Sequence, residues 1–210
     1  MGLAIFGGTF DPVHFGHLRS AVEVCQALQV VEVRLVPAFM PVHRVAPGCS
    51  AEQRLEMLQL GIADNALLRL DDREIRRGGR SYMIDTLNSI RAEIGQGESL
   101  SLVLGADAFN VIHEWRRWRE LLDVAHLVVL GRPDSPIDVN ADVAAWMQDR
   151  LADAVKLQSR PAGLICELQL TQLAISATTI RHLVGAGEPI EYLLPERVID
   201  YIRREALYRD

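Results

Sequence analysis

The chain alternates between short apolar runs and helical patterns, and this alternation constrains the fold more than any other feature. The apolar runs that predict strands are 3–8, 33–38, 67–70, 100–105, 127–131 and 164–170. Several of them are apolar at nearly every position, which is typical of strands buried on both faces of a parallel sheet. Helical patterns fill the intervals between them. The sequence therefore predicts an α/β fold with a doubly wound, mainly parallel sheet and helices on both faces.

The helical patterns also divide the chain into regions. They cover 16–29, 51–63, 82–95, a broken region at 106–122, 140–153, 177–186 and 195–206. Two proline-rich or turn-rich segments, 37–50 and 132–140, are expected to be loops, and long loops in compact domains are often functional. Because no repeat or linker interrupts the 210 residues, we expect a single domain over 1–210. The helical segment from about 175 to 210 is expected to pack on it.

Composition and charge narrow the range of partners. The chain is 49% hydrophobic and 24% charged, as soluble globular proteins are, and its net charge of −6 argues against a general nucleic-acid binder. A small anionic ligand stays compatible with this charge, because local N–H groups and arginines can hold phosphate in an acidic protein.

No run approaches the roughly 20 apolar residues of a membrane span, and none resembles a signal peptide. Cys25, Cys49 and Cys166 form no CxxC pair, so we expect free thiols and a cytoplasmic location.

The first motif lies where the first predicted strand meets the first predicted helix. Residues 7–17 read GGTFDPVHFGH. The glycines allow close approach of a ligand to the backbone, and the N–H groups and dipole of the helix start favour an anion. The stretch matches neither the GxGxxG fingerprint of dinucleotide-binding folds nor the P-loop.

The two histidines of this motif admit three interpretations. His14 and His17 have no matching third ligand nearby and no HExxH pattern, so we expect no protein-held metal. An acid–base role requires a substrate proton that the residues alone do not identify. The glycines, the helix start and the imidazole donors together favour phosphate binding.

The motif resembles the GGTFDPxHxGH signature of the HxGH nucleotidyltransferases, whose fold is Rossmann-like. ISATTIR at 175–181 is similar to the second signature of that group, IS-x-T-x-x-R. Within the group the chain is most similar to the bacterial nicotinate mononucleotide adenylyltransferases. This likeness covers four further stretches: PAFMPVHR (37–44), SYMIDTL (81–87), GADAFNVIHEW (105–115) and LLPERVIDYIRREALY (193–208). Val42 and Met83 depart from the family pattern, where proline and threonine are usual.

The resemblance implies the transfer of AMP from ATP to nicotinate mononucleotide, which yields deamido-NAD and pyrophosphate. The mononucleotide phosphate would attack the α-phosphate of ATP directly. The enzyme would align two polyanions and stabilise the developing charge, with Mg²⁺ bound through the ATP phosphates. His17, His14 and Arg181 would be the catalytic residues, with Arg181 on the β- and γ-phosphates.

The resemblance also implies two sets of binding residues. The ATP set consists of Gly7, Gly8, Thr9, Phe10, His14, His17, Arg44, Gly105, Asp107, Ile175, Ser176, Thr178 and Arg181. The mononucleotide set consists of Thr9, Tyr82, Met83, Ile84, Thr86, Trp115 and Arg132. Trp115 would stack on the pyridine ring, and the N–H groups of Met83 and Ile84 would bind the nicotinate carboxylate.

Several alternatives stay open at this point. A phosphopantetheine adenylyltransferase or an amide-preferring mononucleotide enzyme would share the two signatures. A class I aminoacyl-tRNA synthetase fragment is disfavoured by the short chain and the lack of basic surface. A non-catalytic nucleotide sensor and a zinc-binding module are alternatives from other classes. Assembly into a homo-oligomer is also left open.

Overall fold

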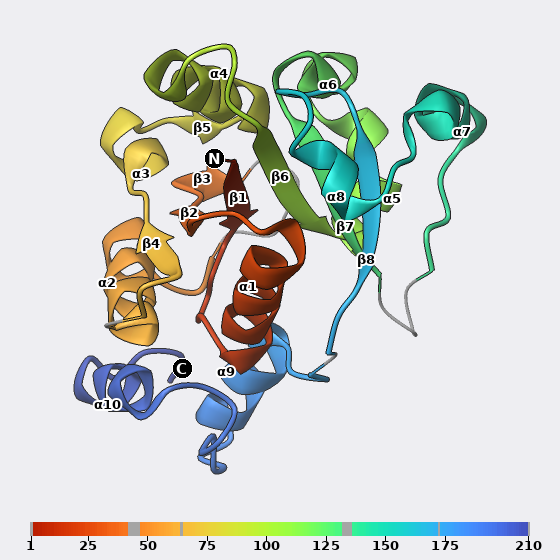
Figure 1. Cartoon of the computed structure of the whole chain (residues 1–210). Coiled ribbons are helices and arrows are strands. Elements are labelled where there is room, and N and C mark those ends of the chain that lie inside the picture. The colour runs from red at the N-terminus through yellow and green to blue at the C-terminus, as the bar shows by residue number, and fades with distance from the viewer. Residues whose placement is uncertain (1, 42–46, 64, 132–135, 172, 210) are drawn as a thin grey trace.

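A six-stranded parallel sheet forms the centre of the computed structural model, which describes residues 2–41, 47–63, 65–131, 136–171 and 173–209 (Figure 1). The strands follow the order β4-β2-β1-β6-β7-β8, and every neighbouring pair is parallel. Their bounds are β1 Leu3–Gly8, β2 Val33–Pro37, β4 Leu68–Leu70, β6 Leu100–Gly105, β7 His126–Gly131 and β8 Ile165–Gln169. The predicted α/β class and parallel sheet are confirmed.

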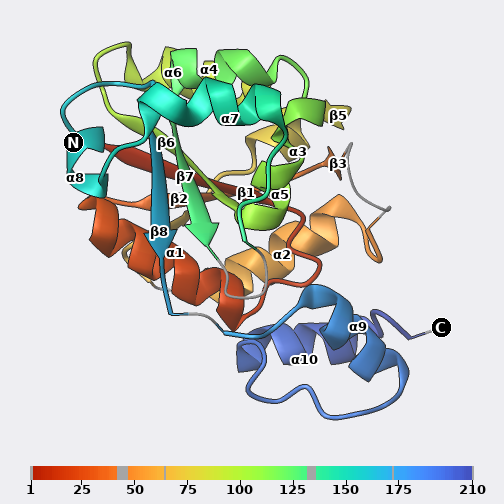
Figure 2. The same cartoon turned by 90° about the vertical axis from the view of Figure 1, so that its right-hand side faces the viewer.

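Helices cover both faces of this sheet, as Figure 2 shows. Among the described residues, one face carries α1 Phe15–Leu28 and α2 Ala51–Ile62, and α9 Ala177–Gly185 and α10 Glu196–Arg204 lie beyond these two. The other face carries α4 Met83–Ile94, α5 Ala106–Asn110, α6 Leu121–Val124 and α7 Ala141–Met147. Each face buries its own apolar cluster against the sheet. The prediction of a single domain over 1–210 stays a prediction.

The shorter elements were harder to predict. The expected loop at 37–50 contains β3 Met40–Pro41, which pairs with β5 Arg80–Ser81, and 42–46 lie outside the described residues. The prediction also lacked α3 Arg73–Arg77 and α8 Ala154–Leu157, because five and four residues are too few to show a period. The broken region is divided into α5, two 3₁₀ turns at Ile112–Glu114 and Trp118–Glu120, and α6. A third 3₁₀ turn, Gln148–Arg150, ends the helix predicted at 140–153.

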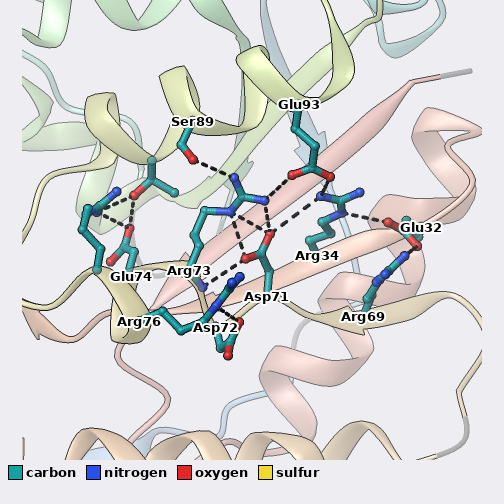
Figure 3. Close-up of polar contacts among 12 residues, drawn as sticks. Glu32, Arg34, Arg69, Asp71, Asp72, Arg73, Glu74, Arg76, Ser89 and Glu93 are labelled. Atoms are coloured by element: carbon teal, nitrogen blue, oxygen red, sulfur yellow. Dashed lines mark hydrogen bonds and ion pairs between the residues drawn. The ribbon is translucent and has the colours of Figure 1, made fainter.

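An ion-pair cluster at the β4 edge of the sheet joins the sheet to α3 and α4 (Figure 3). Arg73 Nη2 lies 2.7 Å from an Asp71 carboxylate oxygen and 2.6 Å from a Glu93 oxygen, and Arg34 Nη1 lies 2.8 Å from the other Glu93 oxygen. Hydrogen bonds from Arg73 and Arg34 lower the pKa of Glu93. The cluster fixes α4 against the sheet edge. It therefore helps to place the first turn of α4, which faces the cavity described below.

None of the helices in the described part of the chain combines the length and apolar character that a bilayer crossing requires. The cysteines Cys25, Cys49 and Cys166 are free thiols, as the sequence predicts.

His126 at the start of β7 is fully buried, and its two ring nitrogens have different partners. The Leu164 N–H donates to Nδ1 at 3.1 Å, so Nδ1 is an acceptor, and Nε2 lies 2.9 Å from the Arg160 carbonyl oxygen. A proton on Nδ1 would face the Leu164 N–H. Burial lowers the pKa of His126, and the folded chain therefore keeps this imidazole neutral.

This burial predicts a pH dependence of stability. Below the ordinary His pKa of 6.5, the unfolded chain takes up a proton that the folded chain does not bind. The free energy of unfolding should therefore fall as the pH drops from 7 to 5, with a contribution from His126 of at most about 1.4 kcal/mol per pH unit. Urea unfolding across this range measures it. His126→Gln should reduce the slope, whereas His113→Gln, at an exposed position, should not. Equal slopes for His126→Gln and wild type would contradict this account.

Candidate active site

The location of the candidate site follows from the order of the strands. From β1 the chain moves outward to β2 and β4, whereas from β6 it moves outward in the other direction to β7 and β8. Ligands of such sheets bind beyond the carboxyl ends of the strands where the order reverses. A cavity of about 820 Å³ lies there, at the ends of β1 and β6 and between the first turns of α1, α4 and α9.

Most of the residues predicted for the site line this cavity. They are Gly7, Gly8, Thr9, Phe10, His14, His17, Tyr82, Met83, Ile84, Gly105, Asp107, Trp115, Ile175, Ser176, Thr178 and Arg181. Arg44 and Arg132, also predicted for the site, lie outside the described residues. The structure thus brings both signatures, some 160 residues apart in the sequence, to one cavity.

The two histidines lie together at the start of α1. His14 is the N-cap residue of the helix, with an extended backbone, and its ring stacks on that of His17 with 3.7 Å between the centroids and 30° between the planes. The Phe10 ring packs edge-on against His17, with the centroids 5.1 Å apart. The first turn of α1 contains no acidic residue, so no side chain of that turn opposes its positive dipole end. Two fixed imidazoles and a helix start therefore face the cavity together.

Two arginines hold the backbone of the turn between β1 and α1. Arg54 of α2 donates to the Thr9 carbonyl oxygen at 2.8 Å, and Arg181 of α9 donates to the Asp11 carbonyl oxygen at 2.7 Å. Arg54 is 1% exposed and also donates to the Phe39 carbonyl oxygen at 3.0 Å. Burial lowers the pKa of Arg54. These contacts join the turn to α2 and α9, so the second signature fixes the geometry of the first.

The start of α9 lies beside the first turn of α1, since a Cβ added to Gly16 would lie 3.5 Å from the Ile175 carbonyl oxygen. Ser176 is its N-cap and accepts a hydrogen bond from the Thr179 N–H at 3.1 Å. The Arg181 guanidinium lies one turn further on, where it also contacts the Thr178 hydroxyl at 3.3 Å. The predicted cap and arginine are thus next to each other at a helix start, an arrangement suited to phosphate oxygens.

The first turn of α4 forms the third side. Met83 extends over the end of β1, since a Cβ added to Gly7 would lie 2.5 Å from the Met83 methyl carbon. Next to it, the Arg116 guanidinium lies 4.7 Å from the centre of the Tyr82 ring, which is within the range of a cation–π contact. Arg116 lines the cavity and was not among the predicted site residues. Its position directly after Trp115 was the signal that could have identified it.

Thr86 was predicted to bind the mononucleotide, but the structure does not place its side chain in the cavity lining. It is fully buried, donates to the Glu74 carboxylate at 2.5 Å and accepts from Arg77 at 3.0 Å. Glu74, which is 2% exposed, lines the cavity instead and was missed. It lies on the short helix α3, which has no recognisable sequence pattern. The Thr86 hydroxyl therefore supports Glu74 from behind the cavity wall.

The carboxylates of the cavity are Asp11, Glu74 and Asp107. Asp11 and Glu74 accept hydrogen bonds from neighbouring protein groups. Within the described ranges, no three His, Cys, Asp or Glu side chains form a potential metal-binding group. The donor set fits a cation that arrives with phosphate oxygens and water as its main ligands.

Comparisons with known proteins show what the chain is similar to. The sequence profile of the cytidylyltransferase-like family matches residues 5–183. The probable nicotinate-nucleotide adenylyltransferase of Methylococcus capsulatus is 46% identical over 208 residues, which cover 98% of this chain and 99% of the relative. That of Marinobacter nauticus is 47% identical over 205 residues, 97% of this chain and 95% of the relative.

A solved structure is also similar. It is the Plasmodium falciparum nicotinic acid mononucleotide adenylyltransferase complexed with NaAD. Its TM-score is 0.76 over 99% of this chain and 97% of the other, at 16% identity, a likeness that shows the fold alone.

The placement of Thr86 gives a testable prediction. Thr86→Val keeps the shape but leaves the buried Glu74 carboxylate without its hydroxyl donor, so the free energy of unfolding should fall by about 1–3 kcal/mol. Urea unfolding measures the change. Thr86→Ser retains the hydroxyl and should recover a large part of the loss. A Thr86→Val variant as stable as wild type would rule out this supporting role.

Proposed function

The chain belongs to the cytidylyltransferase-like family and, within it, to the nicotinate-nucleotide adenylyltransferases, and we propose that it transfers AMP from ATP to nicotinate mononucleotide. The products are deamido-NAD and pyrophosphate. The observation that carries the proposal is the meeting of the stacked histidines and Arg181 in one cavity at the reversal of strand order. ATP and nicotinate mononucleotide are the proposed partners, and the cytoplasm is the proposed location.

The proposed reaction is a direct displacement at phosphorus. An oxygen of the mononucleotide phosphate forms a bond to the α-phosphorus of ATP while the bond to the bridging oxygen of the β-phosphate breaks, and pyrophosphate leaves with that electron pair. The attacking phosphate is already an anion near neutral pH, so no strong general base is needed. The task of the protein is to align the two phosphates and to stabilise the charge that develops.

His17 and His14 are proposed to act on the α-phosphate. Their rings stack at the start of α1, where imidazole N–H groups and the helix dipole can stabilise negative charge together. Gly7, Gly8 and Thr9 allow the nucleotide to approach the end of β1. Because Phe10 and the stacking contact fix both rings, little reorganisation is required when charge develops.

The leaving group is proposed to lie at the start of α9. Arg181 and the hydroxyls of Ser176 and Thr178 line that side of the cavity and suit the β- and γ-phosphates. Asp107, just after β6, is proposed to hold the adenosine end together with Gly105 and Ile175. Mg²⁺ bound to the triphosphate would neutralise part of its charge.

The pyridine ring is proposed to lie between Trp115 and the start of α4. The N–H groups of Met83 and Ile84 would bind the nicotinate carboxylate, an acceptor that an amide replaces only in part. Asp85 in the same turn carries a negative charge that would repel the nicotinate carboxylate. Arg116 Nη1 lies 4.0 Å from the Asp85 carboxylate. Arg116 would therefore offset Asp85 and favour the acid over the amide.

A paired-substrate assay tests the function directly. The purified protein receives ATP and Mg²⁺ with either nicotinate mononucleotide or its amide counterpart, and pyrophosphate release is measured. The acid should support turnover, and the amide should support much less. Turnover with the amide alone would point to an amide-preferring enzyme. ATP binding without pyrophosphate release from either substrate would favour a nucleotide sensor.

The role proposed for His17 predicts a large kinetic effect. His17→Ala should lower kcat by roughly 10²–10³-fold, the scale seen when one donor to a transition state is lost. The exposed His182 of α9, which is not part of the cavity lining, provides the control, and His182→Ala should leave kcat near wild type. Near-normal turnover in His17→Ala would contradict the assigned role.

The charge of Arg116 predicts a change in selectivity. Its side chain is 53% exposed, so Arg116→Gln should lower kcat/KM for the acid by about two- to fivefold and leave the amide nearly unchanged. Arg119→Gln is the matched control, because the Arg119 guanidinium lies 4.3 Å from the Trp118 ring centre and does not line the cavity. Equal losses for acid and amide would show that the Arg116 charge does not select the substrate.

A further inference from the structure

The Asp11 carboxylate is a meeting point for three distant segments of the chain. It is buried, and its Oδ2 accepts a hydrogen bond from the Gly48 N–H at 2.7 Å. Its Oδ1 accepts from the Tyr208 hydroxyl at 2.8 Å and from the Cys49 thiol at 3.1 Å. The Arg181 Nη1 lies 3.6 Å from Oδ2. The first signature, the segment before α2 and the segment after α10 therefore share one carboxylate.

Tyr208 is the stronger of the two side-chain donors to Asp11 Oδ1. Burial raises the pKa of Tyr208 above its ordinary value and raises that of Cys49 to about 12, so both groups stay protonated at neutral pH. A thiol is a weak donor, whereas a phenol makes a short, charge-assisted bond to a carboxylate. Without the Tyr208 hydroxyl, Oδ1 would keep only the thiol.

The contacts of Arg181 show why this matters for the cavity. Arg181 donates to the Asp11 carbonyl oxygen at 2.7 Å, whereas its distance to the Asp11 carboxylate is 3.6 Å, so the ion pair is loose. The Gly48 and Tyr208 donors already satisfy both carboxylate oxygens. Without the Tyr208 hydroxyl, the Asp11 carboxylate would turn towards the Arg181 guanidinium. It would then compete with phosphate for Arg181.

Packing supports the same link. A Cβ added to Gly48 would lie 3.2 Å from the Tyr208 ring and 3.3 Å from Arg181 Cδ, so the backbone of Gly48 lies against both side chains. Tyr208 therefore contacts the Asp11 carboxylate directly and lies close to Arg181, although it follows Arg181 by 27 positions in the sequence.

We propose that Tyr208 is a positioning residue for the phosphate end of the site, and that it acts through Asp11 to keep Arg181 available for the leaving pyrophosphate. This inference rests on the proposed function, because it assumes that Arg181 binds the β- and γ-phosphates. It gives a role to the end of the stretch 193–208, to which no other function has been assigned above. Tyr208 itself is not proposed to touch the substrate.

The test uses inorganic pyrophosphate as the probe. Tyr208→Phe removes only the hydroxyl and should weaken pyrophosphate binding by roughly tenfold, as measured by calorimetry with the full-length protein and Mg²⁺. In steady-state kinetics the same variant should raise KM for ATP and leave KM for nicotinate mononucleotide within twofold. Tyr192→Phe is the control, because Tyr192 is 91% exposed and is not among the partners of Asp11 given above.

A double-mutant cycle separates positioning from general destabilisation. Arg181→Lys keeps a cation and measurable affinity but cannot make the same contacts. If Tyr208 acts through Arg181, adding Tyr208→Phe to Arg181→Lys should change pyrophosphate affinity by less than twofold. An unchanged affinity in the single Tyr208→Phe variant would overturn the proposal. So would a tenfold loss in both backgrounds or an equal rise of both KM values, since each points to a purely structural role.

The cycle is independent of the acceptor substrate. If the paired-substrate assay gave no product with either mononucleotide, the proposed function would fail, whereas pyrophosphate titration would still report the coupling of Tyr208 to Arg181. If Tyr208→Phe unfolds at the assay temperature, titration at a lower temperature, where thermal unfolding shows it folded, gives the same comparison.

Discussion

The site depends on the hydrogen bonds that two guanidinium groups donate to the turn between β1 and α1. Arg54 holds the Thr9 carbonyl oxygen and Arg181 holds that of Asp11, from helices that lie far apart in the sequence. Main-chain carbonyls in a turn cannot all bond to one another, so they need such donors when they are buried. The result is a rigid turn that fixes the stacked histidines at the start of α1.

The parallel sheet supplies the place where this turn becomes useful. Strands β1 and β6 are central neighbours from which the chain departs in opposite directions, and this leaves a cavity at their carboxyl ends. Three helix starts then face the same space, from α1, α4 and α9. Each presents the positive end of a helix dipole, which favours anions, so a protein with a net charge of −6 can still bind two polyanions.

Much of this was predictable because the strong signals are local. The runs 3–8 and 100–105 are buried on both faces and read as strands without context, and the paired signatures indicated His14, His17 and Arg181. The parts that were missed depend on contacts between distant segments. Glu74 enters the cavity on a five-residue helix, and Thr86 does not line the cavity because Glu74 and Arg77 engage its hydroxyl. No local pattern could join Asp11 to Gly48 and Tyr208.

In the proposed mechanism the histidines hold the α-phosphate and do not attack it. The stereochemistry at phosphorus distinguishes these two roles, when ATP carries sulfur in one configuration on the α-phosphate. A single in-line displacement by the mononucleotide inverts the configuration in the dinucleotide product. We therefore expect inversion. Retention would mean two displacements, with the adenylyl group first carried by a side chain such as His17, and would contradict the proposed mechanism.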